Sequence, residues 1–355
     1  MKSYIKKKLI GALALAATAT FMLTGCASKN PAEYTDQAME ALTSQNYSGA
    51  LTMFDQAMLE GEDREIIYRG MGLCYMGQGD YRKAITAFES ALANADIIPG
   101  DLEYDINYYM AICYYKLGLY NEAIAVYDSI ATLNPKDYEV YILRGTMKLY
   151  LSDVDNAMAD FDNAVALAKD DYSVYLDVYQ CMKERGYADN AVKYLDVVMA
   201  AEEKKVDAYD KGRLCYFSGQ YQNAENYLEK ARSEGNLSLD LIMLLCECYK
   251  LEQKYDYAIA VYSTYLDANQ NPEIYNQMGL CYVANGDYTN ALSAFQMGIA
   301  IEDNNTCIQT LNLNEIACYE YMHMYDEARE KLTEYLSIYP MTEDLEREYA
   351  FLTTR

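Results

Sequence analysis

Apolar residues recur along this chain at intervals of three and four, interrupted at regular points by short polar turns. The segment 70–91, GMGLCYMGQGDYRKAITAFESA, shows the pattern clearly. Both halves of it carry apolar positions at i, i+3, i+4 and i+7, which is helical spacing. Ala84, Phe88 and Ala91 therefore share one face of the second helix. Since one pair of helices cannot bury such a face alone, the pattern predicts stacked copies of the same unit.

The same unit recurs nine times. An alanine just after the turn between the two helices marks each copy, and successive markers lie 33 to 39 residues apart, most often 34. An aromatic residue or leucine follows every marker by four positions, and a tyrosine precedes most markers by three. The markers are Ala50, Ala84, Ala123, Ala157, Ala191, Ala224, Ala258, Ala291 and Ala328. This spacing predicts nine antiparallel helix hairpins.

The repeat resembles the tetratricopeptide repeat (TPR) family, whose unit is 34 residues of paired antiparallel helices. The small residue of the family's first helix corresponds to Ala38, Gly72, Ala111, Gly145 and Gly279, and the tyrosine three positions later to Tyr75, Tyr114, Tyr249, Tyr282 and Tyr319. The resemblance covers about residues 31–340. It implies an all-α, right-handed superhelical solenoid of about nine hairpins. In the sixth copy, Cys215-Tyr216 lies one position nearer its marker than Cys74-Tyr75 does, which predicts a turn shorter by one residue.

The remaining segments flank the array. We expect a lipoprotein signal peptide at 1–25, a lipidated cysteine with a short tether at 26–32, the repeats at 33–340 and a capping helix at 341–355. Thr342 offers an N-cap oxygen for that last helix. Leu345, Tyr349 and Leu352 share one of its faces, as a helix that shields the end of a repeat array requires.

The N-terminal segment carries the signs of export. A basic start, MKSYIKKK, precedes the apolar run 9–23, which is too short for a comfortable membrane span. Leu23-Thr24-Gly25-Cys26 then resembles the bacterial lipobox, which implies cleavage before Cys26 and acylation of its thiol. The alternative is an ordinary secretory peptide in which Cys26 is incidental. Acylation would anchor the protein to the cell membrane, facing the extracytoplasmic side.

The charge and the composition exclude several functions. The net charge of −25 disfavours nucleic acid, because phosphate binding needs clustered Lys and Arg. The only histidine is His323 and no Cys-x-x-Cys pair occurs, so we expect no metal site, no cofactor and no catalytic set. A hydrolase with an undetected site is the weakest alternative.

Six of the ten cysteines precede a tyrosine at a similar place in the first helix of a hairpin. A position that recurs with the repeat is set by packing, and free cysteine behaves as a small buried hydrophobe. We therefore expect no disulfide ladder. So many unpaired thiols are unusual in an oxidising compartment, which suggests a source organism that lives without oxygen. The six are Cys74, Cys113, Cys215, Cys248, Cys281 and Cys318.

The family resemblance places ligand-facing residues on the first helices, which line a concave groove. These positions are aromatic, aliphatic and basic, a mixture that suits an extended peptide or an amphipathic helix. The alternative for each of them is packing within the repeat. They are Arg69, Leu73, Met76, Tyr108, Ile112, Tyr115, Lys116, Leu149, Tyr150, Lys183, Leu214, Phe217, Met243, Lys250 and Tyr321.

These features predict a membrane-anchored scaffold that binds a protein or peptide partner at the bacterial cell envelope. The alternative is a solute- or glycan-binding surface lipoprotein associated with a transporter.

Overall fold

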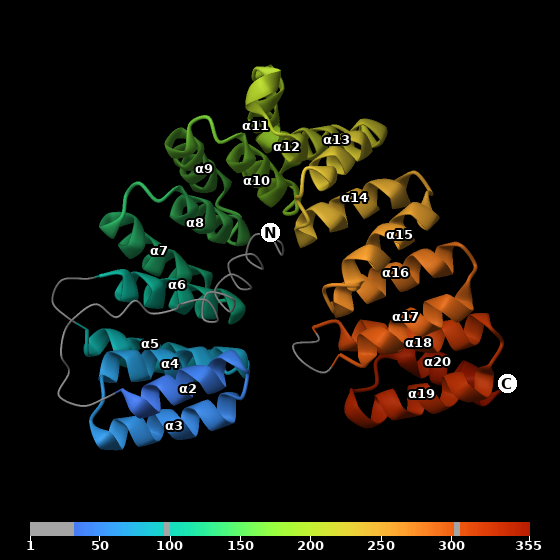
Figure 1. Ribbon diagram of the computed structural model, residues 1–355, viewed down its shortest axis with the longest axis horizontal. Helices are drawn as coiled ribbons and strands as arrows, with labels where there is room; N and C mark the ends of the chain where they lie inside the picture. The colour runs from blue at the N-terminus through green and yellow to red at the C-terminus, as the bar shows by residue number, and fades with distance from the viewer. Residues whose placement is uncertain (1–31, 96–99, 302–305) are drawn as a thin grey trace. The chain divides into compact units, whose positions relative to one another are not determined.

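The chain is all-helical in a computed structural model that describes residues 32–95, 100–301 and 306–355 (Figure 1). The proposed leader and Cys26 lie outside the described residues, as do parts of the two longest inter-repeat segments, at 96–99 and 302–305. Nineteen α-helices and one short 3-10 helix make up the secondary structure of the described part. The chain divides into two compact units, which meet in sequence between Ala201 and Glu202.

Unit 1 contains five antiparallel helix hairpins. Within it, the second helix of each hairpin packs against the first helix of the next. The pairs are α2 (Glu33–Thr43) with α3 (Tyr47–Glu60), α4 (Arg64–Gly77) with α5 (Tyr81–Ala93), α6 (Asp101–Lys116) with α7 (Tyr120–Leu133), α8 (Tyr138–Tyr150) with α9 (Val154–Ala168), and α10 (Tyr172–Lys183) with α11 (Ala188–Ala200).

Unit 2 contains the other four hairpins and the final helix. It begins with the 3-10 helix η1 (Glu203–Lys205), and its hairpins stack in the same manner. The pairs are α12 (Ala208–Phe217) with α13 (Tyr221–Ser233), α14 (Leu239–Leu251) with α15 (Tyr255–Leu266), α16 (Pro272–Ala284) with α17 (Tyr288–Ile299), and α18 (Ile308–Tyr321) with α19 (Tyr325–Ile338); α20 (Glu343–Thr353) follows. The nine predicted hairpins are thus confirmed, whereas the right-handed twist stays a prediction.

Small residues let the two helices of a hairpin approach closely. All nine marker alanines are fully buried. A Cβ added to Gly72 would lie 2.4 Å from a ring atom of Phe88, and one added to Gly279 would lie equally close to Phe295. Because no carbon tolerates such a distance, glycine at this position sets the close contact between the helices.

The prediction of a shorter turn in the sixth hairpin is wrong. Residues 218–220 separate α12 from α13, and residues 78–80 separate α4 from α5, so both turns have three residues. Gly212 also contacts Leu228 as Gly72 contacts Phe88. The Cys-Tyr pair has therefore moved by one position along α12 itself. As a result Cys215 is only half-buried, whereas Cys74 is fully buried.

One buried ionic cluster joins the helices of the fourth hairpin. Asp160 of α9 is almost fully buried and accepts hydrogen bonds from Arg144 Nε at 3.0 Å and from Lys148 Nζ at 2.7 Å. In the ninth hairpin the equivalent positions carry the opposite charges. Glu315 replaces Arg144, and Lys331 replaces Asp160. There the buried Glu315 accepts a hydrogen bond from Gln296 Nε2 at 2.9 Å.

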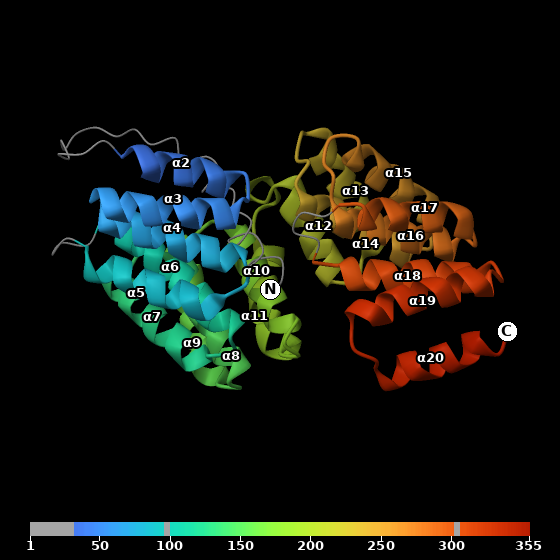
Figure 2. The ribbon, with the colours of Figure 1, turned by 90° about the horizontal axis from the view of Figure 1, so that it is seen from below.

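The last helix covers the end of unit 2. The Thr342 hydroxyl accepts a hydrogen bond from the Leu345 amide at 3.4 Å and so caps α20. Leu352 is fully buried against the core of the ninth hairpin, with Leu345 partly buried beside it. Figure 2 shows α20 next to α19. Tyr349, which was expected on the same face, is exposed.

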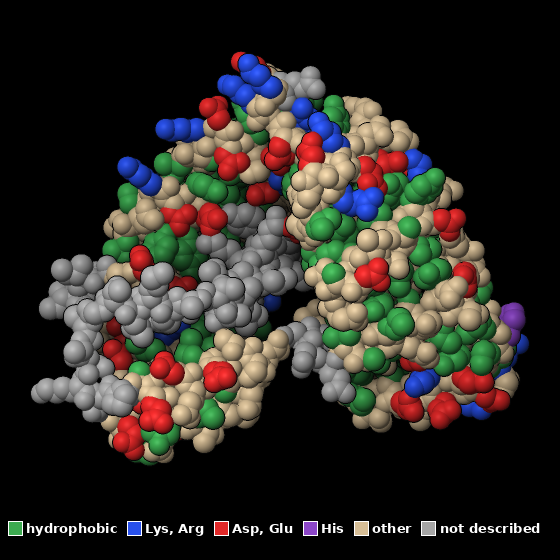
Figure 3. Space-filling model, in the orientation of Figure 1, with side chains coloured by type: hydrophobic (Ala, Val, Ile, Leu, Met, Phe, Trp, Pro, Cys, Tyr) green, Lys and Arg blue, Asp and Glu red, His purple; other side chains and the backbone are tan. Residues whose placement is uncertain are grey.

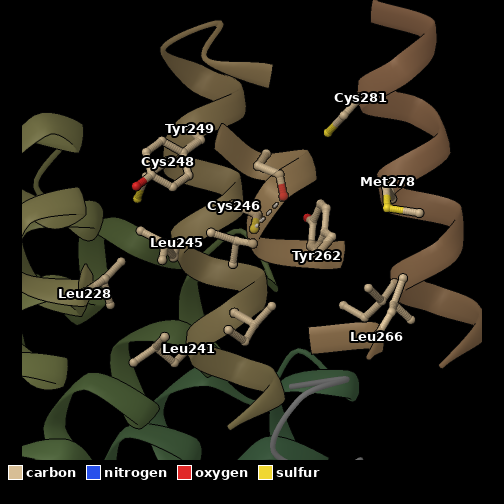
Figure 4. Close-up of a cluster of buried hydrophobic side chains, with 14 of the residues drawn as sticks. Leu228, Leu241, Leu245, Cys246, Cys248, Tyr249, Tyr262, Leu266, Met278 and Cys281 are labelled. Atoms are coloured by element: carbon tan, nitrogen blue, oxygen red, sulfur yellow. Dashed lines mark hydrogen bonds between the residues drawn. The ribbon is translucent and has the colours of Figure 1, made fainter. Parts of the chain in front are cut away.

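The thiols contribute to the core. In unit 2 the free thiols Cys246, Cys248 and Cys281 lie in one apolar cluster (Figure 4). Cys246 donates a weak hydrogen bond to the Ala258 carbonyl at 3.6 Å. Burial raises the pKa of the Cys248 thiol to about 12 and that of the Cys281 thiol to about 11. These thiols therefore stay protonated near neutral pH.

Candidate partner-binding surface

The predicted groove residues fall into three groups by exposure. The buried ones are Leu73, Tyr108, Ile112 and Leu149; the half-buried ones are Arg69, Met76, Tyr115, Tyr150, Leu214, Phe217, Met243 and Lys250; the exposed ones are Lys116, Lys183 and Tyr321. The first group packs between helices and presents little surface to a ligand. Ligand binding by any of these residues stays a prediction.

Tyr108 illustrates the buried group. Its hydroxyl donates to Asp137 Oδ2 at 2.7 Å, and the Tyr104 hydroxyl donates to the same atom. Asp137 in turn caps α8 by accepting from the Glu139 amide at 3.0 Å. Burial and this carboxylate raise the pKa of Tyr104 to about 12. Both tyrosines thus fasten α6 to the start of the next hairpin.

Two predicted basic residues are also held by neighbouring helices. Arg69 of α4 forms an ion pair with Asp105 of α6, and its guanidinium lies 5.7 Å from the centre of the Tyr109 ring. Lys250 donates to Gln277 Oε1 at 2.9 Å and pairs with Glu247 at 2.7 Å. Their charges are therefore largely used within the array.

A stack of aromatic rings and one guanidinium crosses three hairpins of unit 1. The Tyr120 and Tyr150 rings are stacked with centroids 4.5 Å apart and planes 13° apart. The Arg185 guanidinium carbon lies 3.4 Å from the centre of the Tyr150 ring. The hydroxyls of Tyr115 and Tyr150 are hydrogen-bonded at 2.9 Å. The half-buried Tyr115 and Tyr150 thus serve the contacts between hairpins.

The same contact site recurs elsewhere in the chain. Tyr288 and Tyr321 hold positions equivalent to Tyr120 and Tyr150, and their rings are stacked with centroids 5.0 Å apart. In the first two hairpins, Tyr47 packs against Gly77. A Cβ added to Gly77 would lie 2.3 Å from the Tyr47 ring. The sequence contains a pattern that could have revealed this contact. In these three pairs, the tyrosine three positions before a marker packs on the residue that ends the first helix of the next hairpin.

An aromatic–basic surface remains at the C-terminal ends of α6, α8 and α10. We define it as Tyr115, Lys116, Tyr150, Lys183 and Arg185. Lys116 and Lys183 are exposed, while the two tyrosines and Arg185 are half-buried. Burial, together with the Tyr115 hydroxyl, raises the pKa of Tyr150, so its hydroxyl stays protonated and can donate. Three cations and the Tyr150 hydroxyl suit carboxylate and carbonyl oxygens.

The described part of the chain offers few groups for other chemistry. There, no group of three or more His, Cys, Asp and Glu side chains is placed to hold a metal ion. His323 is exposed at the turn between α18 and α19, and its Nδ1 lies 3.0 Å from the Tyr325 hydroxyl. No described helix is both long and apolar enough to span a bilayer.

Comparisons with known proteins agree with this architecture. Three tetratricopeptide repeat profiles match the chain, at residues 69–138, 218–281 and 272–305. These matches span hairpins in both units. The chain is a tetratricopeptide repeat protein.

The individual matches have low sequence identity to this chain. The chain is 26% identical over 184 residues to BBSome complex member BBS4 of Bos taurus, covering 51% of this chain and 35% of that protein. It thus spans about a third of the length of that relative. Among solved structures, an IFIT1 monomeric mutant with Gppp-AAAA matches over 95% of this chain and 84% of its own, with 15% identity and a TM-score of 0.51. A tetratricopeptide repeat protein from Parabacteroides merdae matches over 80% and 98%, with 17% identity and a TM-score of 0.47.

Proposed function

We propose that this protein is a lipid-anchored adaptor that binds a protein or peptide partner at the bacterial cell envelope. The observation that carries the proposal is the aromatic–basic surface at the ends of α6, α8 and α10. Stacked helices hold it rigidly, and rigid presentation lowers the entropy that binding costs. The TPR fold is consistent with such a role in protein–protein interaction.

The anchor rests on the lipobox-like Leu23-Thr24-Gly25-Cys26. Acyl chains on Cys26 contribute about 0.8 kcal/mol per buried methylene, so two or three chains hold a protein at a bilayer without a spanning helix. Confinement to the membrane raises the effective concentration of the adaptor toward a partner in the same membrane.

The surface supports a peptide better than a sugar. A sugar platform needs an open aromatic face, but Tyr120 covers one face of the Tyr150 ring and Arg185 lies over that ring as well. What remains accessible is polar and basic: the ammonium groups of Lys116 and Lys183 and the edges of the rings. Backbone carbonyls and acidic side chains of a peptide complement such groups.

Site-specific photo-crosslinking tests this function. A photoreactive amino acid replaces Lys116 or Lys183 in the full-length protein, and adducts formed in native membranes are identified by mass spectrometry. The same partner should be captured from both positions. Ala166, exposed on α9, serves as the matched control. If the control position yields the same adducts, or if neither lysine position yields any, this surface is not the binding site.

A further inference from the structure

The tether limits how far the first hairpin can stand from the membrane, a point that rests on the lipid anchor proposed above. Only five residues, 27–31, lie between Cys26 and Ala32, where the described chain begins. Fully extended, they reach roughly 20 Å, since a residue spans at most about 3.6 Å. The start of α2 is therefore held near the lipid headgroups.

The hydrogen bonds at the start of α2 define which edge of the hairpin is held there. Glu62, in the turn between α3 and α4, accepts from the Tyr34 amide at 3.0 Å and from the Thr35 amide and hydroxyl at 2.9 and 2.6 Å. The end of α3 and the start of α2 thus lie side by side. Burial acts to raise the pKa of Glu62, but the hydrogen bonds from Thr35 and Tyr34 outweigh it and hold the pKa below its ordinary value. The carboxylate therefore stays charged and keeps this edge assembled.

Leu59 lies in the last turn of α3, at this same edge. Its side chain is 80% exposed, the largest exposed fraction among the large hydrophobic side chains that the structure describes. Exposing a leucine to water is unfavourable. Moving its side chain into the boundary between headgroups and acyl chains lowers the free energy, because apolar surface leaves water. Exposed acidic side chains outnumber basic ones in the adjoining segments, with Glu33, Glu60 and Asp63 against Arg64. Their charges favour a neutral lipid surface over an anionic one.

We propose that the first hairpin rests on the bilayer through the edge formed by the start of α2 and the end of α3, with Leu59 inserted among zwitterionic lipids. This arrangement directs the remaining hairpins of unit 1 away from the anchor point along the stacking direction of that unit.

The absence of tryptophan from the chain makes this contact measurable. Leu59→Trp in the full-length acylated protein provides a single reporter. Leu151→Trp is the matched control, because Leu151 is 41% exposed at the opposite end of a hairpin, in the turn between α8 and α9. Both variants are bound to phosphatidylcholine vesicles whose acyl chains carry bromine, a fluorescence quencher. Leu59→Trp should lose fluorescence and shift its emission to shorter wavelength, and Leu151→Trp should do neither.

The outcomes separate the contact from the anchor. Mass spectrometry first establishes whether Cys26 carries acyl chains; an unmodified Cys26 overturns the anchor and this contact together. With Cys26 acylated, equal quenching at the two positions, or none at position 59, overturns the contact alone. Adding phosphatidylglycerol at low salt should weaken the quenching of Leu59→Trp, and stronger quenching there would overturn the preference for neutral lipid. Circular dichroism confirms that both variants are folded.

Discussion

Tyr120 and Tyr150 belong to successive hairpins, yet their rings stack almost in parallel with centroids 4.5 Å apart. The contact shows that aromatic side chains, in addition to the small residues, fix how one hairpin sits on the next. Arg185 extends the stack into a third hairpin. A surface built on this stack is as rigid as the packing beneath it.

Removing the ring at the middle of the stack should weaken unit 1. Tyr150→Ala removes the contacts with Tyr120 and Arg185, and we expect a loss of roughly 2–3 kcal/mol in the free energy of unfolding. Tyr150→Phe keeps the ring and gives up the hydrogen bond to Tyr115, so it should lose only about 1 kcal/mol. Urea denaturation followed by circular dichroism measures both values. Equal losses would mean that stacking contributes nothing.

Enlarging a marker alanine should strain the hairpin that contains it. Ala84 is fully buried, so Ala84→Leu forces the helices of the second hairpin apart and should cost about 1–3 kcal/mol of unfolding free energy. Ala166→Leu, at an exposed position on α9, is the control and should change stability by less than about 0.5 kcal/mol. The same denaturation experiment compares them. If the two variants match, the contact at Ala84 is not close-packed.

The thiols should be nearly inert in the folded protein. Burial raises the pKa of Cys74 and of Cys113 to about 12, and only the thiolate reacts rapidly. Half-buried Cys215 and Cys307 should react first with a chromogenic disulfide reagent at pH 7.5, and the buried thiols only after denaturant is added. Counting the thiols in denaturant also tests the anchor. Nine should titrate if Cys26 is acylated and ten if it is free. Rapid reaction of many thiols in the native protein would contradict the burial.

Acidity should strengthen the docking of the last helix. Burial, together with the carboxyl group of Glu348 in α20, raises the pKa of Glu320 in α18 from 4.5 to about 7. Between these two pH values the folded protein holds a proton that the unfolded chain has lost. The free energy of unfolding of unit 2 should therefore fall as pH rises from about 4.5 to about 7, and then level off.

Glu320→Gln should remove this part of the pH dependence. The measurement is urea unfolding of the variant and of the parent protein at several pH values, with Glu346→Gln, at an exposed position of α20, as the control. The difference between Glu320→Gln and the parent protein should change with pH, while that for the control stays constant. Identical pH profiles for all three proteins would mean that Glu320 does not hold this extra proton in the folded protein.

Limited proteolysis should separate the two units. Lys204 and Lys205 are exposed in η1, where the units meet in sequence, whereas Lys169 is exposed within unit 1. Trypsin should cut at η1 first and leave two fragments whose summed helical signal equals that of the intact chain, because each has its own apolar core. Replacing both lysines with glutamine should suppress that cut. First cleavage at Lys169, or loss of helix on cleavage, would contradict two compact units.

The sequence predicted the repeat better than the surface. Regular alanine spacing fixed the number of hairpins, because every marker occupies the same close contact between two helices. The spacing carried no sign of the two units, since Ala191 and Ala224 flank the junction at an ordinary interval of 33 residues. Nor did it reveal which first-helix residues are buried. The buried Tyr108 donates a hydrogen bond to Asp137, a partner in the next hairpin that periodicity alone does not point to.

The contact between Tyr47 and Gly77 has a consequence for how such a chain can evolve. The Tyr47 ring occupies space that only a glycine at position 77 leaves open. In two other pairs of hairpins, the position equivalent to Gly77 is a tyrosine, which stacks on Tyr120 or Tyr288. The reversed charges of Arg144 and Glu315 add a second mismatch. Hairpins of this protein are therefore not interchangeable modules. We expect a duplication or deletion of one hairpin to bring together surfaces that clash or leave voids, so the order of the copies matters for packing.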